Sequence, residues 1–335
     1  MPKLSIILPT YNRGKFISTA LSSIIKQTFT DWELIIVDDG STDDTKEQID
    51  ALMLNNRGKL TYIYQDNGGA YAARKTGLDH ASGELITFFD SDDLWMHNHL
   101  DDVVALLDKH PQLDWLTVRD CQVKTTENLE LANQEMSPIP AQITSLESTW
   151  KGDLQMIESP ALVETLLNTG HNCGLPLSVM RRHVIEKTSM DATHRNGEDR
   201  MFLIRAVKHG IKIAILHRIH YIFLQHNGNS SAAALTITRE KKLAIYKAIS
   251  AGYRKLDDDL HLSKKERRAL HKRVAKDLFW CVGYEINWEA GHHSEAFEAF
   301  SEALALSPLN LAMRKTYFLC LFKAKLRLSK SKLMA

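Results

Sequence analysis

The first 120 residues alternate short apolar runs with segments whose apolar residues recur at helical spacing. The apolar runs are bounded by Pro, Asp or Gly and predict buried strands at Leu4–Leu8, Leu34–Val37, Leu60–Tyr64 and Leu85–Phe89. The helical spacing predicts helices at Phe16–Ile25, Thr45–Leu54 and Ala70–Ala81. A chain that repeats strand and helix in this order is typical of the α/β class, with a mostly parallel sheet flanked by helices.

The remainder of the chain continues this pattern less regularly and then becomes helical. Residues 125–165 lose the rhythm, and we expect a polar, loop-rich insertion there. A helix is predicted at Glu198–His209, and strand-like runs follow at Ile211–Leu216 and Tyr221–Leu224. The sequence therefore predicts three regions: the first half of an α/β domain at 1–120, its second half at 121–230, and a helical C-terminal region at 231–335.

Charge is distributed unevenly, although the 335 residues carry a net charge of only +1. Residues 1–230 hold 22 Lys and Arg against 30 Asp and Glu, whereas residues 231–335 hold 20 against 11. An acidic domain that binds an anion needs a cation or local basic groups. The C-terminal cations predict either a solvated helical face or contact with anionic lipid head groups; they include Lys264, Lys265, Arg267, Arg268, Lys272, Arg273 and the run Lys323–Lys332. No nucleic-acid-binding motif accompanies them, so a nucleic acid is not an expected partner.

The sequence lacks long apolar segments and cysteine motifs. The runs Leu4–Leu8 and Tyr317–Phe322 are too short for a signal-peptide core and for a membrane-spanning helix, which need about 7–15 and about 20 apolar residues. The four cysteines have no spacing typical of a zinc site, and we expect them to be reduced. These features predict a cytoplasmic protein, peripheral on the inner face of the membrane if the basic helices bind lipid.

Three of the predicted strands end in polar turns, at Pro9–Asn12, Asp38–Asp44 and Asp90–Asp93. Ligands of α/β sheets bind beyond the carboxyl ends of the strands, so these turns form the candidate site. Each acidic turn alone could cap the following helix, but their clustering at one edge brings a repulsion that a cation would relieve. In Asp90-Ser91-Asp92, two carboxylates can face one Mn²⁺ or Mg²⁺ ion.

Several other nucleotide-binding and hydrolase motifs are missing from the sequence. No G-x-G-x-x-G follows the first predicted strand, and the sequence contains neither GxxxxGK[ST] nor GxSxG. These absences disfavour a dinucleotide-dependent dehydrogenase, a P-loop phosphohydrolase and an α/β-hydrolase.

The segments LSIILPTYNR, WELIIVDDGSTDDT and GELITFFDSDDLW resemble the nucleotide-sugar-binding half of glycosyltransferase family 2, which consists of inverting enzymes of the GT-A fold. The resemblance is dense over residues 3–120 and looser over 170–230, and we see none after about residue 235. It implies a GT-A domain over residues 1–230, with nucleotide-sugar binding at 1–120 and the acceptor side at 121–230. It also implies a nucleotide-diphosphate donor, with a UDP-sugar favoured, and Mn²⁺ or Mg²⁺ as cofactor.

The resemblance assigns donor roles to residues of the first half. The nucleotide would be held by Pro9, Thr10, Tyr11, Asn12 and Asp39. The ribose, the diphosphate and the shell of the metal ion would be contacted by Asn67, Gly69, Arg74, Asp90 and Ser91. In this scheme Asp39 accepts the uracil N3–H, and Asp92 is a ligand of the metal.

The second half supplies the acceptor side. Glu198 and Asp199 lie at the start of a predicted helix, where the helix dipole also stabilises acidic side chains. The resemblance implies that Asp199 is the general base for the acceptor hydroxyl and that Glu198 orients the acceptor. His226 follows the last strand-like run and would contact the metal or the diphosphate, unless it is an ordinary surface or core histidine.

The favoured reading is therefore an inverting, metal-dependent glycosyltransferase. It would move a sugar from a nucleotide-diphosphate donor to a hydroxyl of a glycan or lipid-linked acceptor, in cell-surface polysaccharide or glycolipid synthesis. A nucleotidyltransferase is the alternative enzyme, although its triphosphate would require a Gly-rich, basic first turn. A catalytically silent nucleotide-sugar or glycan-binding scaffold is the alternative without activity.

Overall fold

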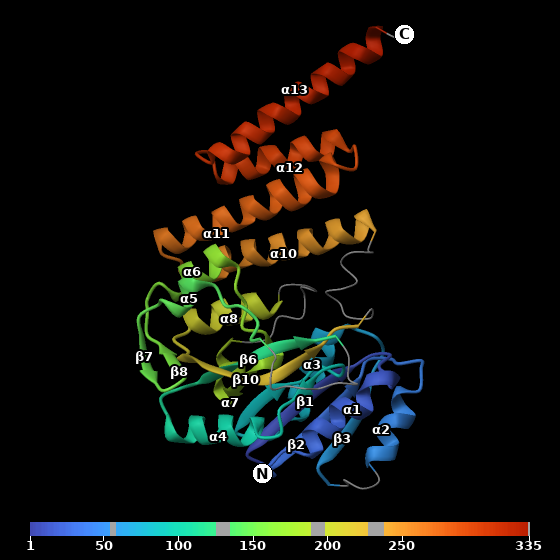
Figure 1. The fold of residues 1–335 in the computed structure, drawn as a ribbon, viewed down its shortest axis with the longest axis vertical. Helices are drawn as coiled ribbons and strands as arrows, with labels where there is room; N and C mark the ends of the chain where they lie inside the picture. The colour runs from blue at the N-terminus through green and yellow to red at the C-terminus, as the bar shows by residue number, and fades with distance from the viewer. Residues whose placement is uncertain (54–57, 125–134, 189–197, 227–237, 334–335) are drawn as a thin grey trace. The chain divides into compact units, whose positions relative to one another are not determined.

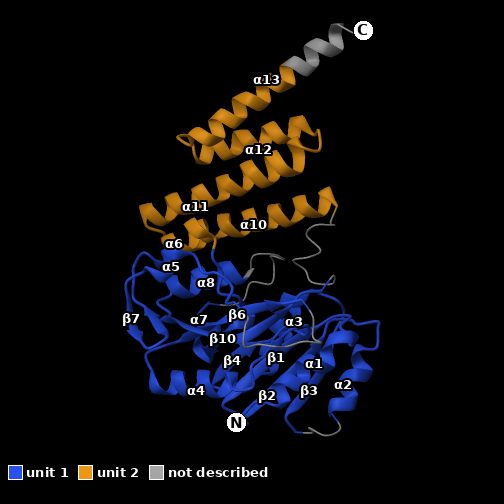
Figure 2. Cartoon of the chain, viewed as in Figure 1, with its two compact units in different colours: residues 1–163, 171–233 blue, residues 164–170, 234–335 orange. Residues whose placement is uncertain are grey.

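The computed structural model describes residues 1–53, 58–124, 135–188, 198–226 and 238–333, with side chains to residue 325 and excepting that of Glu198 (Figure 1). The chain forms two compact units (Figure 2). Unit 1 comprises residues 1–163 and 171–233, and unit 2 comprises residues 164–170 and 234–335. The short segment 164–170 thus groups with the helices that follow residue 233.

A ten-stranded sheet forms the centre of unit 1. Its strands are β1 (Leu4–Thr10), β2 (Trp32–Asp38), β3 (Leu60–Tyr64), β4 (Leu85–Phe88), β5 (Leu94–Trp95), β6 (Trp115–Val123), β7 (Ser148–Lys151), β8 (Leu154–Ile157), β9 (Ser178–Arg181) and β10 (Ile213–Leu224). They lie in the order β3-β2-β1-β4-β9-β6-β10-β8-β7, and β5 pairs with β10.

Strand direction divides this sheet into two parts. The strands β3, β2, β1 and β4 are parallel, so their carboxyl ends meet at one edge. Beyond them, β9 runs antiparallel to both β4 and β6, whereas β6 and β10 are parallel to each other. The predicted α/β class is confirmed, and each antiparallel pair among the described strands includes at least one strand from residues 121–230.

Helices flank the sheet of unit 1 (Figure 1). They are α1 (Gly14–Ile25), α2 (Thr45–Met53), α3 (Ala70–His80), α4 (His99–Lys109), α5 (Ala141–Thr144), α6 (Leu162–Thr169, which continues into unit 2), α7 (Arg182–Thr188) and α8 (Glu198–Lys208), with a 3₁₀ turn, η2 (Leu175–Leu177). Helix α1 buries Ile17, Leu21 and Ile24 because they recur at helical spacing. Helix α3 packs closely on β1, since a Cβ at Gly77 would lie 2.4 Å from Ile7 Cγ2.

Two expectations for the second half need correction. The sequence predicts a loop-rich insertion at 125–165. Residues 125–134 lie outside the described residues, but the remainder contains α5, the β7–β8 hairpin and the start of α6. The hairpin is short and turns at Gly152, whose φ is +64°, and much of β7 is exposed, so it lacks a strong hydrophobic pattern. The two strand-like runs at 211–216 and 221–224 are a single strand, β10. Between Leu216 and Tyr221 the pairing of β10 with β6 shifts in register. This shift interrupts the alternation of inward and outward side chains, so the sequence pattern indicates two separate runs.

Unit 2 consists of helices joined by short turns. They are α10 (Arg239–Asp259), α11 (Lys264–Lys276), a π-helical segment, η3 (Asp277–Trp288), α12 (His293–Leu306) and α13 (Leu311–Leu333). Helix α11 begins with a capping box, in which Ser263 and Glu266 satisfy each other's backbone N–H groups. Phe279 of η3 stacks on Phe300 of α12, with ring centroids 4.4 Å apart. None of the helices in the described ranges is long and apolar enough to span a bilayer.

Two buried histidines lie side by side where α4 meets β10. The ring centroids of His99 and His220 are 5.5 Å apart, and His220 Nε2 lies 3.5 Å from Asp102 Oδ2. Burial lowers the pKa of His220 to about 4, although Asp102 and Asp153 act in the opposite direction and Arg218 adds to the lowering. Burial, together with His220, lowers the pKa of His99 well below its ordinary value. Both rings are therefore neutral in the folded chain near neutral pH.

This pair predicts acid-sensitive stability. Between pH 6.5 and about 4 the unfolded chain binds a proton at position 220 that the folded chain excludes. The free energy of unfolding should be undiminished above pH 6.5 and should decrease toward pH 4, by about 3 kcal/mol for a shift of this size. Denaturant unfolding across this range should show a shallower pH dependence for His220→Leu, and an unchanged one for His97→Gln at an exposed position. A His220→Leu variant with the wild-type pH dependence would contradict this assignment.

Candidate active site

The candidate site lies at the edge where the parallel strands end. Residue-by-residue pairing of β1 with β2 brings Thr10 beside Asp38, and β1 pairs with β4 on its other side. The three polar turns predicted from the sequence therefore follow three adjacent strands. This adjacency brings the turn after β1 between the two acidic turns.

Asn12 joins the turn after β1 to the turn after β2. Its backbone has a φ of +51°, and its N–H donates to Ser41 Oγ at 2.9 Å. In return, Asn12 Oδ1 accepts from the N–H of Thr42 at 2.8 Å. Of the other predicted residues in this turn, Pro9 lies within β1, Thr10 is buried, and the Tyr11 side chain is 45% exposed at the surface. The turn is thus held in place from both sides, with Tyr11 facing solvent.

Asp39 organises the loop that precedes α3. Its Oδ1 accepts hydrogen bonds from Gln65 Nε2 at 2.7 Å and from the N–H of Gly68 at 2.8 Å, and its Oδ2 accepts from the N–H of Gly69 at 2.7 Å. The Asn67 side chain donates to the carbonyl oxygen of Asp39. Gly69 has a φ of +91°, a conformation open to glycine. The structure therefore brings the predicted residues Asp39, Asn67 and Gly69 together, and it adds Gln65.

Asp90 lies in an acidic environment with one cation beside it. Arg74 donates to Asp90 Oδ1 at 2.8 Å. Burial raises the pKa of Asp90, the Arg74 guanidinium lowers it, and the carboxylates of Asp92 and Asp199 raise it further. Asp90, Asp92 and Asp199 are therefore near enough to influence one another, although Asp199 follows the other two by more than 100 residues.

Asp92 has two basic partners on a single oxygen. Arg13 Nε lies 3.0 Å from Asp92 Oδ2, and His226 Nε2 lies 3.2 Å from the same atom. The His226 ring stacks on Phe16 of α1, with centroids 4.0 Å apart and planes inclined by 22°. The side chains of Asp92 and His226 are only 13% and 14% exposed. The structure thus places the candidate His226 beside Asp92, and it adds Arg13 and Phe16, which were not identified from the sequence.

Asp93 anchors the acidic turn to β10. It accepts hydrogen bonds from the Tyr221 hydroxyl at 2.8 Å and from the N–H of Leu224 at 3.0 Å. Burial, with the carboxylates of Asp90 and Asp92 beside it, raises the pKa of Asp93 to about 8. His226 follows two residues after Leu224, so this anchor also determines where His226 lies relative to Asp92. The predicted residue Ser91 is buried within the same turn.

Asp199 lies in the first turn of α8, after the predicted helix start. Its Oδ2 is 3.4 Å from the N–H of Leu175 in η2, a contact at the long end of hydrogen bonding. The Glu198 side chain lies outside the described residues, as do Asn196 and Gly197. The structure therefore places one of the two predicted acceptor-side carboxylates near the acidic turn.

The site suits a divalent ion that takes most of its ligands from a bound substrate. Among the described residues, no group of three or more His, Cys, Asp or Glu side chains surrounds a common metal position. Asp92 and His226 are nevertheless adjacent and supply an oxygen and a nitrogen. Mg²⁺ is commonly held by one or two carboxylates together with substrate phosphates and water. The residues present therefore fit such an ion when a diphosphate is also bound.

Curated relatives match the first part of the chain. The UDP-Glc:alpha-D-GlcNAc-diphosphoundecaprenol beta-1,3-glucosyltransferase WfgD of Escherichia coli is 40% identical over 107 residues, which are 32% of this chain and 42% of that protein. The GalNAc(5)-diNAcBac-PP-undecaprenol beta-1,3-glucosyltransferase of Campylobacter jejuni is 43% identical over 95 residues, 28% of this chain and 30% of that protein. The chain thus spans less than half the length of these two relatives.

The structural superposition and the family model cover more of the chain than the curated relatives do. The crystal structure of Staphylococcus aureus TarS 1–349 in complex with UDP-GlcNAc superimposes with a TM-score of 0.65, at 21% identity, over 91% of this chain and 81% of that one. This likeness concerns the fold. The family model for Glycosyl transferase family 2 matches residues 5–188, more than half of the 335 residues. The chain therefore belongs to glycosyl transferase family 2.

Proposed function

We propose that the chain is an inverting, metal-dependent glycosyltransferase. It transfers a sugar from a nucleotide-diphosphate donor, with UDP as the nucleotide, to a hydroxyl of a glycan or lipid-linked acceptor in cell-surface polysaccharide or glycolipid synthesis. The observation that carries the proposal is the meeting of Asp90, Asp92 and Asp199 at the carboxyl ends of the strands, with Arg13 and His226 on Asp92. The UDP-GlcNAc bound by TarS and the lipid-diphosphate acceptor in the name of WfgD support the donor and the acceptor class.

The nucleotide part of the donor occupies the turns after β1 and β2. A carboxylate offers about four acceptor positions, and three of those on Asp39 are filled by Gln65, Gly68 and Gly69. One position is left for the N3–H of uracil. Arg74 approaches the ribose and diphosphate from α3, with its guanidinium held by Asp90.

The diphosphate lies where the acidic turn meets β10. Asp92 and His226 would hold a Mn²⁺ or Mg²⁺ ion, with donor phosphate oxygens and water as further ligands. Such an ion, when bound, stabilises negative charge on the departing diphosphate. Arg13 is the second basic group at this position, and it offers guanidinium N–H donors to the same phosphates.

Asp199 takes the proton of the acceptor hydroxyl. The acceptor oxygen then attacks the anomeric carbon on the side opposite the diphosphate, so a single displacement inverts the configuration. The nucleotide diphosphate leaves without a protein acid, and no carboxylate is assigned as a nucleophile. Glu198 orients the acceptor in this proposal.

Metal-dependent donor binding is the first test of this function. We expect Asp92→Asn to weaken Mn²⁺ and UDP binding together, by about 10- to 100-fold, because it removes one negative charge that contacts the ion. Calorimetric titration of UDP with Mn²⁺ and with a chelator measures the effect. Asp79→Asn, which changes an exposed carboxylate of α3, is the matched control. Equal UDP affinity of the wild type in Mn²⁺ and in chelator would contradict the metal role.

The general base is the second test. Asp199→Asn keeps the side-chain shape but cannot take a proton, so kcat should decrease by about 10²–10⁴-fold while donor affinity changes little. Product NMR should show a β-linked sugar from an α-linked donor. Asp101→Asn on α4 should retain full activity. An α-linked product would exclude inversion, and an absence of both transfer and donor hydrolysis in the wild type would favour a silent scaffold.

Peripheral contact with anionic membrane is part of the proposal, and α13 is the surface that supports it. One side of this helix packs through buried Met313 and Cys320. The other side exposes apolar residues beside cations, namely Leu311, Lys315, Phe318, Leu319, Phe322 and Lys323. Exposed apolar side chains contribute to binding at a bilayer interface, and neighbouring Lys side chains attract anionic head groups.

This surface makes the third test possible. Phe318 and Phe322 are each 63% exposed, so Phe318→Ser with Phe322→Ser should not disturb the core. We expect the double variant to lose about tenfold or more in affinity for phosphatidylglycerol vesicles, measured by co-sedimentation. Tyr64→Ser, at an exposed aromatic residue of unit 1, is the control. Equal binding of the wild type to neutral and anionic vesicles would remove the membrane contact from the proposal.

A further inference from the structure

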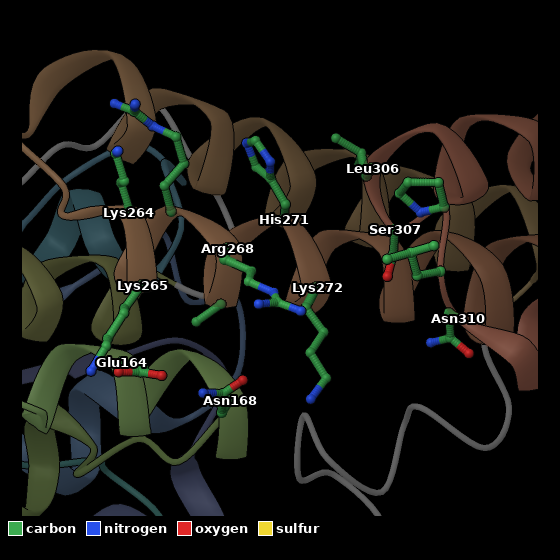
Figure 3. A pocket seen from close by; sticks show the side chains of 14 residues that line it. Glu164, Asn168, Lys264, Lys265, Arg268, His271, Lys272, Leu306, Ser307 and Asn310 are labelled. Atoms are coloured by element: carbon green, nitrogen blue, oxygen red, sulfur yellow. The ribbon is translucent and has the colours of Figure 1, made fainter.

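A broad groove lies within unit 2, with a volume of about 1020 Å³ (Figure 3). Helix α11 forms one wall, and α6 and the turn between α12 and α13 complete it. The charged residues that line it are Glu164, Lys264, Lys265, Arg267, Arg268 and Lys272. A smaller cavity of about 140 Å³ shares Asn168, Lys272 and Asn310 with this groove and adds Lys276 at its far end. The lining therefore carries a strong excess of positive charge.

The cations of α11 form a ridge along the helix. Lys264, Arg268, Lys272 and Lys276 follow one another at intervals of four residues, which places them on one side of an α-helix. All four are exposed, while the opposite side of α11 buries apolar residues such as Leu270 and Val274. Like charges four residues apart destabilise a helix, and Lys264 also lies near the positive end of the helix dipole. The arrangement is therefore unfavourable for α11 on its own.

Neighbouring carboxylates do little to relieve this repulsion. Within the described ranges, Lys264, Lys265, Arg268 and Lys272 form no ion pair, whereas Arg267 is paired with Asp257 at 2.7 Å. Glu164 is the one carboxylate among the residues that line the groove. In Figure 3 the side chains of Arg268 and Lys272 extend into the space between α6 and the α12–α13 turn. Arg268 and Lys272 thus face an open volume that an anion can enter.

The shape of the cationic ridge indicates the class of anion. From Lys264 to Lys276 the helix rises by about 18 Å, so the charges form a line rather than a single cluster. Lys and Arg are common ligands of phosphate groups. The residues lining the larger groove include no Phe, Tyr or Trp on which a nucleic-acid base could stack, and those lining the smaller cavity include a single one, Trp280. The volume is also concave, whereas the head groups of a bilayer form a flat surface.

We propose that this groove binds successive phosphate groups of a chain-like polyanion, a polymer with phosphodiester or phosphoanhydride links. The proposal concerns unit 2 by itself and does not depend on the transfer reaction proposed for unit 1. It also differs from the membrane contact proposed for α13, because it uses the ridge of α11 and a soluble ligand.

The test compares two charge-matched double variants of the full chain. Arg268→Gln with Lys272→Gln removes two cations from the groove. Lys241→Gln with Lys247→Gln removes two exposed cations from α10, away from the groove lining. Binding of long-chain inorganic polyphosphate is measured by calorimetry, with polyglutamate as an anionic chain without phosphate and with phosphatidylglycerol vesicles as a lipid source of phosphate. Circular dichroism and UDP titration of each variant confirm that the fold of both units is retained.

We expect the groove variant to lose at least tenfold in affinity for polyphosphate, and the α10 variant to stay within twofold of the wild type. Polyglutamate should bind the wild type at least tenfold more weakly than polyphosphate, and vesicle binding should be the same for both variants. Equal loss in the two variants, or equal binding of polyglutamate and polyphosphate, would overturn the proposal in favour of general charge attraction. A loss confined to vesicles would overturn it in favour of a lipid-binding surface. If the wild type does not bind UDP, the proposed function is contradicted, whereas the polyphosphate comparison still tests the groove.

Discussion

Repulsion among clustered carboxylates is the constraint on which the site depends. Asp90, Asp92 and Asp93 lie within four residues after one strand, and Asp199 of α8 adds its negative charge near Asp90. Each of the three has a different compensation: Arg74 for Asp90, Arg13 and His226 for Asp92, and the donors of β10 for Asp93. Each basic group therefore lies where it offsets the negative charge of one acidic side chain. Groups of both signs therefore surround the acidic turn, with the basic ones contributed by three other segments.

Most of the parallel part of the sheet could be predicted from the sequence because β1, β2 and β4 are buried on both sides. Continuous apolar runs such as Leu4–Leu8 carry a strong signal, and the structure buries every residue of β1. The second half offers weaker signals. The strand β9 has four residues between a turn and a helix, and its place between β4 and β6 comes from pairing that no local pattern encodes. In β10, the polar pair His217 and Arg218 interrupts the apolar pattern, so the sequence predicts two strands where the structure has one.

The candidate site shows the same division between local and distant information. Asp39, Asp90 and Asp92 follow strands directly, so the sequence identifies them from position alone. Arg13 reaches Asp92 across 79 residues, and Gln65 reaches Asp39 across 26, and neither has a pattern that distinguishes it from an ordinary surface side chain. Phe16 also could not be identified as a site residue, because its spacing matches the other apolar positions of α1, although its ring stacks on His226. These partners are brought together by tertiary packing, so they could not be predicted from the sequence.

The anchoring of Asp93 has a consequence for how the site comes into being. Its two donors, Tyr221 and Leu224, are 128 and 131 residues further along the chain. Contacts over such separations close long loops and form late, because their entropic cost precedes the gain from pairing. During synthesis, the chain therefore completes the parallel strands β1 to β4 well before β10 exists. A nascent chain that ends before residue 224 carries the acidic turn without its anchor, so the candidate site is complete only once the last strand of the sheet has been made.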